Sequence, residues 1–345
     1  MVDSERGDGL DLDAVGAWLA GEVPGLLGEP LTASLITGGK SNLTYRVTDG
    51  ATEVVVRRPP MGHVLATAHD MGREYRVMKA LADTAVPVPV VHAHCDDVDV
   101  TGAPFYVMAS VPGTPYSRAS QLEELGAERT RAIAERLTDT LVDLHAVDPA
   151  SVGLAEFGRP DGYLERQLRR WRKQLDASRS RDIPGIDELA TQLDRQLPSH
   201  SEGTIVHGDY RLDNALVDST PSGGDRITAV LDWEMSTLGD PLTDVALMLA
   251  YQQMAMAGGG AAVTDAPLAP GYPSPDDILQ RYAAGSGRDL GAMGFHVGLA
   301  FFKLAVILEG IHFRHSQGQT RGGGFDGLGD AVVVLVAAGL EATRV

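Results

Sequence analysis

Apolar and polar residues alternate along the first third of the chain, and this two-residue period is typical of half-buried strands. The alternation lies on either side of a glycine pair and resumes after an Asp-Gly turn. The predicted strands cover residues 31–39, 42–50, 52–60 and 104–111. Residues 67–82 instead have helical spacing, with Tyr75, Met78 and Leu81 on one side. The pattern therefore predicts a sheet with one helix, ended by a Pro-Gly turn.

The remainder of the chain changes to a helical period. Ile133, Leu137, Leu141 and Leu144 recur at three- and four-residue spacings, which places them on one buried stripe. Helices are predicted at residues 121–147, 161–178, 185–197, 241–257, 275–285, 290–315 and 326–343. The apolar stretch at 296–310 is either plain core or the wall of an apolar pocket.

A strand pattern at 204–233 interrupts these helices, and residues 258–275 and 321–327 have the Gly, Ala and Pro content of loops. The pattern predicts an α+β protein with two lobes. The small strand-rich N-terminal lobe is assigned to residues 1–111, and the larger, mainly helical C-terminal lobe to residues 112–345.

Composition limits the classes of partner. The 345 residues carry a net charge of −18, which argues against a nucleic-acid backbone or an anionic membrane as the main partner. A small anionic substrate stays compatible, because local charge can oppose the global sign. The single cysteine, Cys95, allows no intramolecular disulfide, the N-terminus lacks a signal-peptide pattern, and apolar runs such as 331–340 are too short to span a bilayer. We expect a cytoplasmic protein.

Residues 206–218, VHGDYRLDNALVD, concentrate polar and charged side chains between apolar ends. Residues 215–217 and a second β-branched run are predicted to form an antiparallel hairpin, in which the entrance of one strand lies opposite the exit of the other. Asn214 and Asp232 stand at those two points, and Asp209 approaches the same region. Two carboxylates and an amide oxygen suit a hard cation such as Mg²⁺, with phosphates filling its remaining positions.

These motifs resemble those of a known family. HGDYRLDN is similar to the catalytic loop of protein kinases, and LDWE stands where the kinase metal-binding aspartate follows its hairpin. The glycine after His207 and the LDWE form resemble the aminoglycoside phosphotransferase family, the small-molecule branch of the kinase-like fold. Further similar segments occur in the family's order from about residue 31 to about residue 315: LITGGKSNLTYRV, VVVRRPP, REYRVMKAL, FYVMASVPG and GDPLTDVALML.

Two other segments, LHAVDP and FGRPDGYLERQLRRW, resemble a subgroup that includes domains fused to acyl-CoA dehydrogenases. The resemblance implies a protein-kinase-like two-lobe fold, with a small antiparallel-sheet N-lobe and a larger helical C-lobe. It also implies ATP between the lobes and Mg²⁺ on its phosphates.

For the catalytic loop, the resemblance implies that Asp209 is the catalytic base and that Asn214 and Asp232 are Mg²⁺ ligands. The alternative for Asp209 is a residue that forms a turn by bonding to its own backbone. The alternative for Asn214 is a turn residue at a strand edge. Arg211 either faces the γ-phosphate or forms a salt bridge within the loop. His207 is expected to brace the loop rather than to move protons.

Asp240 and Asp244 are expected to brace the catalytic loop by accepting backbone hydrogen bonds, rather than to touch substrate. In the N-terminal lobe, strand alternation sends Val55 and Arg57 to one face, toward a nucleotide. Arg57 stands where the family has lysine, and Glu74 is its expected helix partner, unless Glu74 is simply a solvated helix residue.

A strand register shifted by one would instead turn Arg58 inward. The resemblance assigns the remaining nucleotide contacts to the turn between the first strands and to the inter-lobe hinge. These residues are Gly38, Gly39, Ser41 and Asn42 in the turn, and Met108, Ser110 and Val111 in the hinge.

The function implied is an ATP- and Mg²⁺-dependent phosphotransferase that acts on a hydroxyl of a small molecule. The acceptor is expected to be a hydroxyacyl-CoA or another metabolite. One alternative is a genuine aminoglycoside antibiotic phosphotransferase. The other is a nucleotide-binding pseudokinase or scaffold, which the arginine at position 57 favours and the set of Asp209, Asn214 and Asp232 opposes.

Overall fold

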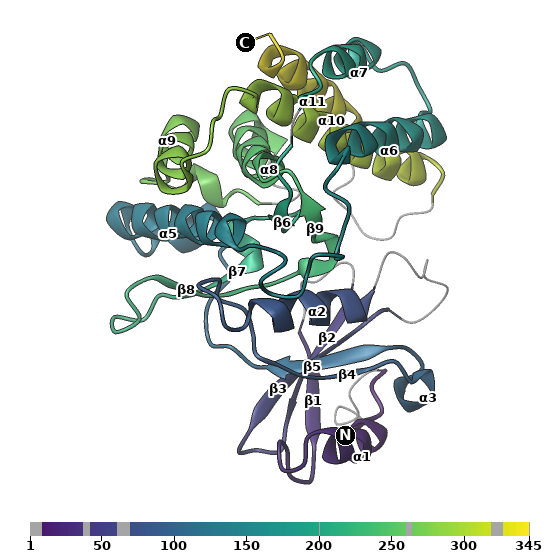
Figure 1. Cartoon of the computed structure of the whole chain (residues 1–345), viewed down its shortest axis with the longest axis vertical. Coiled ribbons are helices and arrows are strands. Elements are labelled where there is room, and N and C mark those ends of the chain that lie inside the picture. The colour runs from purple at the N-terminus through teal and green to yellow at the C-terminus, as the bar shows by residue number, and fades with distance from the viewer. Residues whose placement is uncertain are drawn as a thin grey trace. The chain divides into compact units, whose positions relative to one another are not determined.

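A computed structural model describes most of the chain (Figure 1). The described residues are 9–36, 42–60, 70–199, 201–259, 264–318 and 327–344. The chain divides into two compact units, of which the first comprises Met1–Thr114 with Thr228–Ser236 and the second Pro115–Ile227 with Thr237–Val345. The assignment of nucleotide binding to residues 1–111 and of catalysis to residues 112–345 stays a prediction.

The first unit is built on a five-stranded antiparallel sheet with the strand order β1-β2-β3-β5-β4 (Figure 1). The strands are β1 (Thr32–Leu35), β2 (Leu43–Thr48), β3 (Glu53–Arg58), β4 (Val91–Cys95) and β5 (Phe105–Ala109). Four of them lie within the predicted ranges. The sequence pattern does not predict β4, because its VHAHC places histidines at two of five positions directly after a proline-rich stretch.

The expectation of one helix in this unit is wrong. The described residues form α1 (Leu12–Glu22), α2 (Met71–Leu81) and the short α3 (Val98–Thr101). Helix α1 buries only Val15 and Leu19 and has a glycine inside it, so its apolar period is too brief to stand out. Asp70 caps α2 by accepting the backbone N–H of Arg73, and residues 61–69, where the helix was expected to start, lie outside the described residues.

The two faces of the sheet carry different side chains. Helix α1 packs on one face, where Val54 and Val56 belong to a buried apolar cluster. Val55 alternates to the other face and lies opposite Met108 in the β3–β5 register. This second face is the one that α2 approaches, because Tyr106 of β5 bonds to Glu74 of α2.

The same alternation separates the two arginines of β3. Arg58 lies on the α1 face, where its Nη1 donates to the carbonyl oxygens of Gly9 at 3.0 Å and Thr101 at 2.7 Å. Arg57 shares its face with Val55. The register predicted from the sequence therefore holds, and Arg58 is a buried structural residue.

The second unit is mainly helical. Its helices are α4 (Ala119–Glu123), α5 (Ala127–Ala146), α6 (Tyr163–Ser178), α7 (Ile186–Arg195), α8 (Leu242–Met254), α9 (Pro275–Ser286), α10 (Met293–Ser316) and α11 (Leu328–Ala342). The predicted helix at 121–147 is divided between α4 and α5, because Gly126, the residue before α5, has a non-helical backbone with a φ of +89°. Helix α8 continues into a π-helical turn, Ala255–Gly259.

Short strands and turns frame the predicted loop. β6 (Thr204–Val206) pairs with β9 (Thr237–Gly239), and β7 (Ala215–Asp218) pairs with β8 (Arg226–Val230), so the predicted hairpin is present. The division between the two units falls within β8. Single 3-10 turns occur at Leu212–Asn214, Trp233–Met235 and Ala266–Leu268.

Helix α10 is the centre of the second unit and packs against α6, α7, α8 and α11. It is the one helix among the described residues that is long and apolar enough to cross a membrane by composition alone. However, 72% of its most apolar window is buried inside the protein, as in the core helix of a soluble domain. The stretch at 296–310 is therefore mostly core.

Candidate functional site

Arg57 joins three carboxylates within the first unit. Its Nε lies 3.2 Å from Glu74 Oε2, and its Nη2 contacts Asp232 Oδ1 and lies 4.0 Å from Glu234 Oε2. Glu74 comes from α2, whereas Asp232 and Glu234 flank Trp233. Burial opposes the charge of Arg57, but these carboxylates keep its pKa above the ordinary value. Arg57 therefore remains a guanidinium at all physiological pH.

Glu74 is the most buried member of this group. Its side chain is 1% exposed, and its oxygens accept hydrogen bonds from Tyr106 Oη at 3.0 Å and Asn42 Nδ2 at 3.3 Å. Burial raises the pKa of Glu74 to about 7, and the guanidinium of Arg57 limits that rise. The alternative of a solvated helix residue is therefore wrong.

The other residues predicted to contact the nucleotide have different surroundings. Val55 and Met108 are each 7% exposed and form an apolar pair on the face that carries Arg57. Ser110 Oγ donates to Glu53 at 2.6 Å, and Val111 is half-buried. Gly38, Gly39 and Ser41 lie outside the described residues. Asn42 lies beside Glu74 and also donates to Glu234 Oε2 at 3.1 Å.

Asp232 has an unusual backbone conformation for a non-glycine residue. Its φ is +66° and its ψ +58°, in the left-handed region that costs most side chains energy. The next residue, Trp233, is fully buried and donates its Nε1–H to Val230 O at 2.9 Å. Trp233 therefore anchors the turn that holds Asp232 in this strained conformation. The side chain of Asp232 is 29% exposed.

A buried aspartate of α8 fixes the loop that carries the predicted base in the second unit. Asp244 accepts the backbone N–H groups of His207 at 2.6 Å and Gly208 at 2.7 Å, as the sequence predicted. It also contacts His145 Nε2 at 3.3 Å. Burial disfavours its charge, yet these contacts hold the pKa of Asp244 below its ordinary value. Asp240 does not brace this loop, because it accepts from the N–H of Leu242 in α8.

Asp209 and Asn214 lie together at the two ends of this loop. Asn214 Nδ2 donates to the main-chain oxygen of Asp209 at 2.9 Å and to its Oδ2 at 3.3 Å. Tyr251 of α8 donates its hydroxyl to Asp209 Oδ1 at 3.1 Å. Within the described part of the chain, nothing donates to Asn214 Oδ1, so this oxygen is available to a cation. The Asp209 carboxylate is 25% exposed and can be reached by a ligand.

Arg211 forms the salt bridge within the loop that the sequence allowed as one of two roles. Its Nη2 lies 3.3 Å from both Asp209 Oδ2 and Asp213 Oδ2. Its guanidinium also lies 4.9 Å from the centre of the Tyr251 ring. A contact between Arg211 and a γ-phosphate stays a prediction.

Sequence reasoning missed several side chains at these positions. Tyr251 and Lys303 contact the loop from α8 and α10, and Lys303 Nζ donates to Gly208 O at 3.0 Å. The LDWE motif contains Glu234, but its pattern assigns that residue no role. No local pattern marks Tyr251 or Lys303, because both occur in apolar helices far from the loop in sequence. Among the described residues, no three His, Cys, Asp or Glu side chains group as metal ligands.

The structure thus brings the predicted residues together in two sets. Arg57, Glu74 and Asp232 meet in the first unit, and Asp209, Arg211 and Asn214 in the second. A metal ion shared by Asn214 and Asp232 stays a prediction.

The model of the phosphotransferase enzyme family matches residues 32–278. Acyl-CoA dehydrogenase family member 11 of Rattus norvegicus is 35% identical over 345 residues, which cover 97% of this chain and 43% of that protein. The chain therefore spans less than half the length of this relative.

Solved structures share the fold. A candidate aminoglycoside phosphotransferase of Ralstonia eutropha is 32% identical, with a TM-score of 0.82 over 97% of this chain and 98% of that one. The ADP-bound aminoglycoside phosphotransferase APH(2'')-Ib has a TM-score of 0.58 over 97% and 99% of the two chains. Its 14% identity supports a likeness of fold alone. The α+β, protein-kinase-like fold predicted from the sequence is confirmed.

Proposed function

Since the chain belongs to the phosphotransferase enzyme family, we propose that it transfers the γ-phosphate of ATP to a hydroxyl of a small molecule. The observation that carries this proposal is the loop at Asp209. Asp244 fixes the backbone of this loop, and Tyr251 and Asn214 donate hydrogen bonds to the Asp209 carboxylate. The Asp209 carboxylate stays accessible. A rigidly held carboxylate of this kind suits the orientation of an attacking hydroxyl.

The first unit provides the groups for a nucleotide. Arg57 is held by Glu74 and keeps its positive charge, and a guanidinium can bind phosphate oxygens with two N–H groups. Val55 and Met108 offer a buried apolar surface for a base on the same face of the sheet. The backbone of residues 108–111 and the segment 38–42, for which the sequence predicts a turn, would hold adenine and the phosphates, as in the family that the sequence resembles.

The donor atoms also fit Mg²⁺, which prefers oxygen ligands and commonly takes one or two from the protein. The partly exposed carboxylate of Asp232 and the Oδ1 atom of Asn214 would hold it. When bound, the ion neutralises charge on the phosphates.

Asp209 would accept the proton of the acceptor hydroxyl as the new oxygen–phosphorus bond forms. The bond between the γ-phosphorus and its bridging oxygen breaks in the same transfer, and ADP leaves. Tyr251 and Arg211 orient the Asp209 carboxylate in that step. Positioning and charge stabilisation supply most of the rate in such chemistry.

Incubation of the purified protein with γ-labelled ATP, Mg²⁺ and a panel of acceptors tests the proposal. The panel comprises hydroxy acids, hydroxyacyl-CoA thioesters, simple alcohols and aminoglycosides. Label that appears in one acceptor class and disappears with the Asp209→Asn variant supports phosphotransfer. A protein that binds neither ATP nor ADP, with or without Mg²⁺, contradicts it and favours a scaffold.

A further inference from the structure

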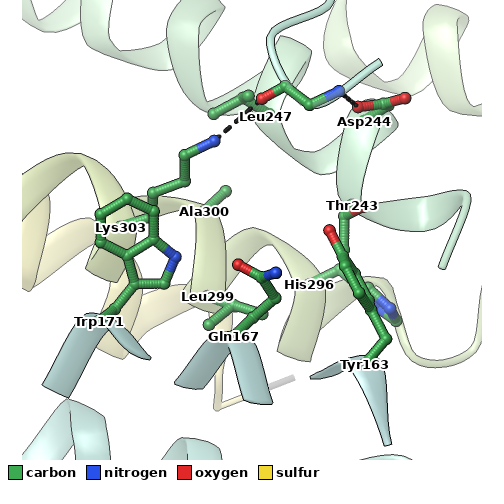
Figure 2. Close-up of a pocket in the computed structure, with 11 residues that line it drawn as sticks. Tyr163, Gln167, Trp171, Thr243, Asp244, Leu247, His296, Leu299, Ala300 and Lys303 are labelled. Carbon is green, nitrogen blue, oxygen red and sulfur yellow. Dashed lines mark hydrogen bonds between the residues drawn. The ribbon is translucent and has the colours of Figure 1, made fainter. Parts of the chain in front are cut away.

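A small pocket of about 40 Å³ lies beside Gly208, the residue before the proposed base, and all of its lining belongs to the second unit. Helix α6 contributes Gln167 and Trp171, and α10 contributes Lys303 (Figure 2). The volume exceeds the space that one water needs and suits a compact group such as a carboxylate.

Lys303 brings a terminal amino group into this pocket, and no acidic partner is in contact with it among the described residues. Its Nζ has three hydrogen atoms to donate, and one bonds to Gly208 O at 3.0 Å. The ammonium also lies 5.8 Å from the centre of the Trp171 ring. Within the described ranges, no carboxylate lies within ion-pair distance of Lys303. Lys303 is half-buried, and an ammonium partly removed from water with donors left over is stabilised when an anion joins it.

Two carboxylates act on Lys303 without contacting it: Asp244, which also lines the pocket, and Asp209, which does not. Each is engaged elsewhere. Asp244 bonds to the loop backbone, and Asp209 bonds to Tyr251 and Asn214. Burial lowers the pKa of Lys303, and these carboxylates oppose that effect only in part. An anion that enters the pocket would supply the counter-charge that Lys303 lacks among the described residues.

Gln167 adds a second polar group to the pocket. Figure 2 shows its amide projecting between Trp171 and Tyr163. Among the residues that the structure describes, this amide has no hydrogen-bond partner, so its N–H₂ group is free to donate to a ligand. Trp171 is 4% exposed and supplies an apolar wall next to the two donors.

The helix that carries Gln167 is basic in a strongly acidic chain. Helix α6 has five basic residues and two acidic ones, whereas the whole chain has a net charge of −18. Arg170 is exposed beside Trp171, with its guanidinium 5.3 Å from the ring centre. A local positive potential of this kind attracts anions and repels polycations.

We propose that Lys303 and Gln167 bind an anionic group of the acceptor, a carboxylate or a phosphate ester, while the acceptor hydroxyl reaches Asp209. The proposal rests on the proposed phosphotransfer and names its acceptor class as hydroxyl-bearing organic anions. Gly208 and Asp209 are adjacent, and consecutive Cα atoms lie about 3.8 Å apart. Since Gly208 lines the pocket and Asp209 follows it directly, we expect an acceptor in which a short carbon chain joins the anion to the hydroxyl. Cationic aminoglycosides should be poor acceptors.

The first experiment measures binding without nucleotide, so that it does not depend on turnover. The ligands are ω-hydroxyalkanoates of two to six carbons, the matching hydroxyalkyl phosphates, and the neutral N-methylamides of the same hydroxy acids. Titration calorimetry compares the wild type with Lys303→Met, with the charge-retaining Lys303→Arg, and with Lys173→Met. Lys173 is an exposed lysine of α6 outside the pocket lining and serves as the matched control.

We expect Lys303→Met to weaken binding of the anions by about 30-fold or more, because it removes one partner of a buried charge pair. Binding of the amides should change by less than about threefold, as should anion binding to Lys173→Met. Lys303→Arg should retain the preference for anions over amides. Tighter binding of the hydroxyalkanoates would identify the anionic group of the acceptor as a carboxylate, and tighter binding of the hydroxyalkyl phosphates would identify it as a phosphate ester.

The second experiment measures label transfer from ATP to the same ligands. Lys303→Met should raise KM for the anionic acceptors and leave KM for ATP unchanged. If Lys303→Met weakens the anionic and the amide acceptors equally, Lys303 only supports the loop. If the variant raises KM for ATP, Lys303 belongs to the nucleotide site. Either result overturns the proposal. Transfer to amides or aminoglycosides, with no anion binding that depends on Lys303, overturns the acceptor class alone. Anion binding without any ATP binding or transfer overturns the phosphotransferase function and leaves the anion site.

Discussion

Arg57 Nε lies 3.2 Å from Glu74 Oε2, and this contact ties strand β3 to helix α2 inside the first unit. The resembling family has lysine at the position of Arg57, and arginine is longer and planar. The structure shows that a guanidinium can still reach the buried glutamate while a second nitrogen contacts Asp232. The arginine is therefore compatible with charge neutralisation in a nucleotide site.

The two neighbouring arginines of β3 provide a matched pair of variants. We expect Arg57→Met to weaken binding of ATP by about tenfold or more, because a phosphate partner and the counter-charge of Glu74 are both lost. Arg58→Met should leave that affinity nearly unchanged, since Arg58 lies on the opposite face of the sheet. Fluorescence titration with a labelled nucleotide measures both, and equal losses would contradict the assignment.

The burial of Glu74 predicts a pH dependence of stability. Its pKa is about 7 in the folded protein, against an ordinary value of 4.5, so the folded state holds this proton more tightly than the unfolded state. The contribution to the free energy of unfolding is thus fully present below about pH 4.5 and is lost as the pH rises through about 7.

Denaturant unfolding of the wild type and of Glu74→Gln at pH 5 and pH 8 measures this effect. The glutamine cannot titrate, so the wild type should lose about 3 kcal/mol relative to the variant between the two pH values. Parallel stability profiles would show that Glu74 stays ionised beside Arg57.

Asp209→Asn should lower kcat by about 100- to 10,000-fold, the usual contribution of a general base. ATP binding should persist, because the other proposed nucleotide contacts are intact. Initial-rate kinetics with the best acceptor, together with nucleotide titration, check both parts. Asp139→Asn, which removes an exposed ion pair between α5 and Arg281 of α9, serves as the control. A parallel collapse of ATP affinity would show that Asp209 is not specifically the base.

Asp244→Ala should lower the free energy of unfolding by about 2–5 kcal/mol. It would leave two backbone N–H groups, those of His207 and Gly208, without their buried acceptor. Asp244→Asn keeps one acceptor oxygen and should cost less. Urea denaturation compares the three proteins, and an alanine variant as stable as the wild type would contradict the bracing role.

Much of the local structure could be predicted because it depends on short stretches of chain. Alternation placed Val55 and Arg57 on one face of β3, and the hairpin of β7 and β8 was readable from its strands and turn. The spacing of Asp209 and Asn214 identified the loop because it is a local feature of eight residues.

Other elements escaped prediction because their local signal is weak. Helix α1 has a short apolar stripe, and β4 has little alternation, so both depend on the core they join. The division of the predicted helix at 121–147 depends on the positive φ of one glycine, Gly126.

The sequence alone determined the family, the α+β class, and the residue types that perform the proposed chemistry. These follow from the order and spacing of short motifs along the chain. Only the tertiary structure decided which distant side chains meet them. Tyr251 and Lys303 belong to apolar helices, and nothing in their neighbours indicates that they point at the loop. Packing of α8 and α10 brings them there, because contacts between distant segments are set by how helices bury their faces and not by the residues beside them.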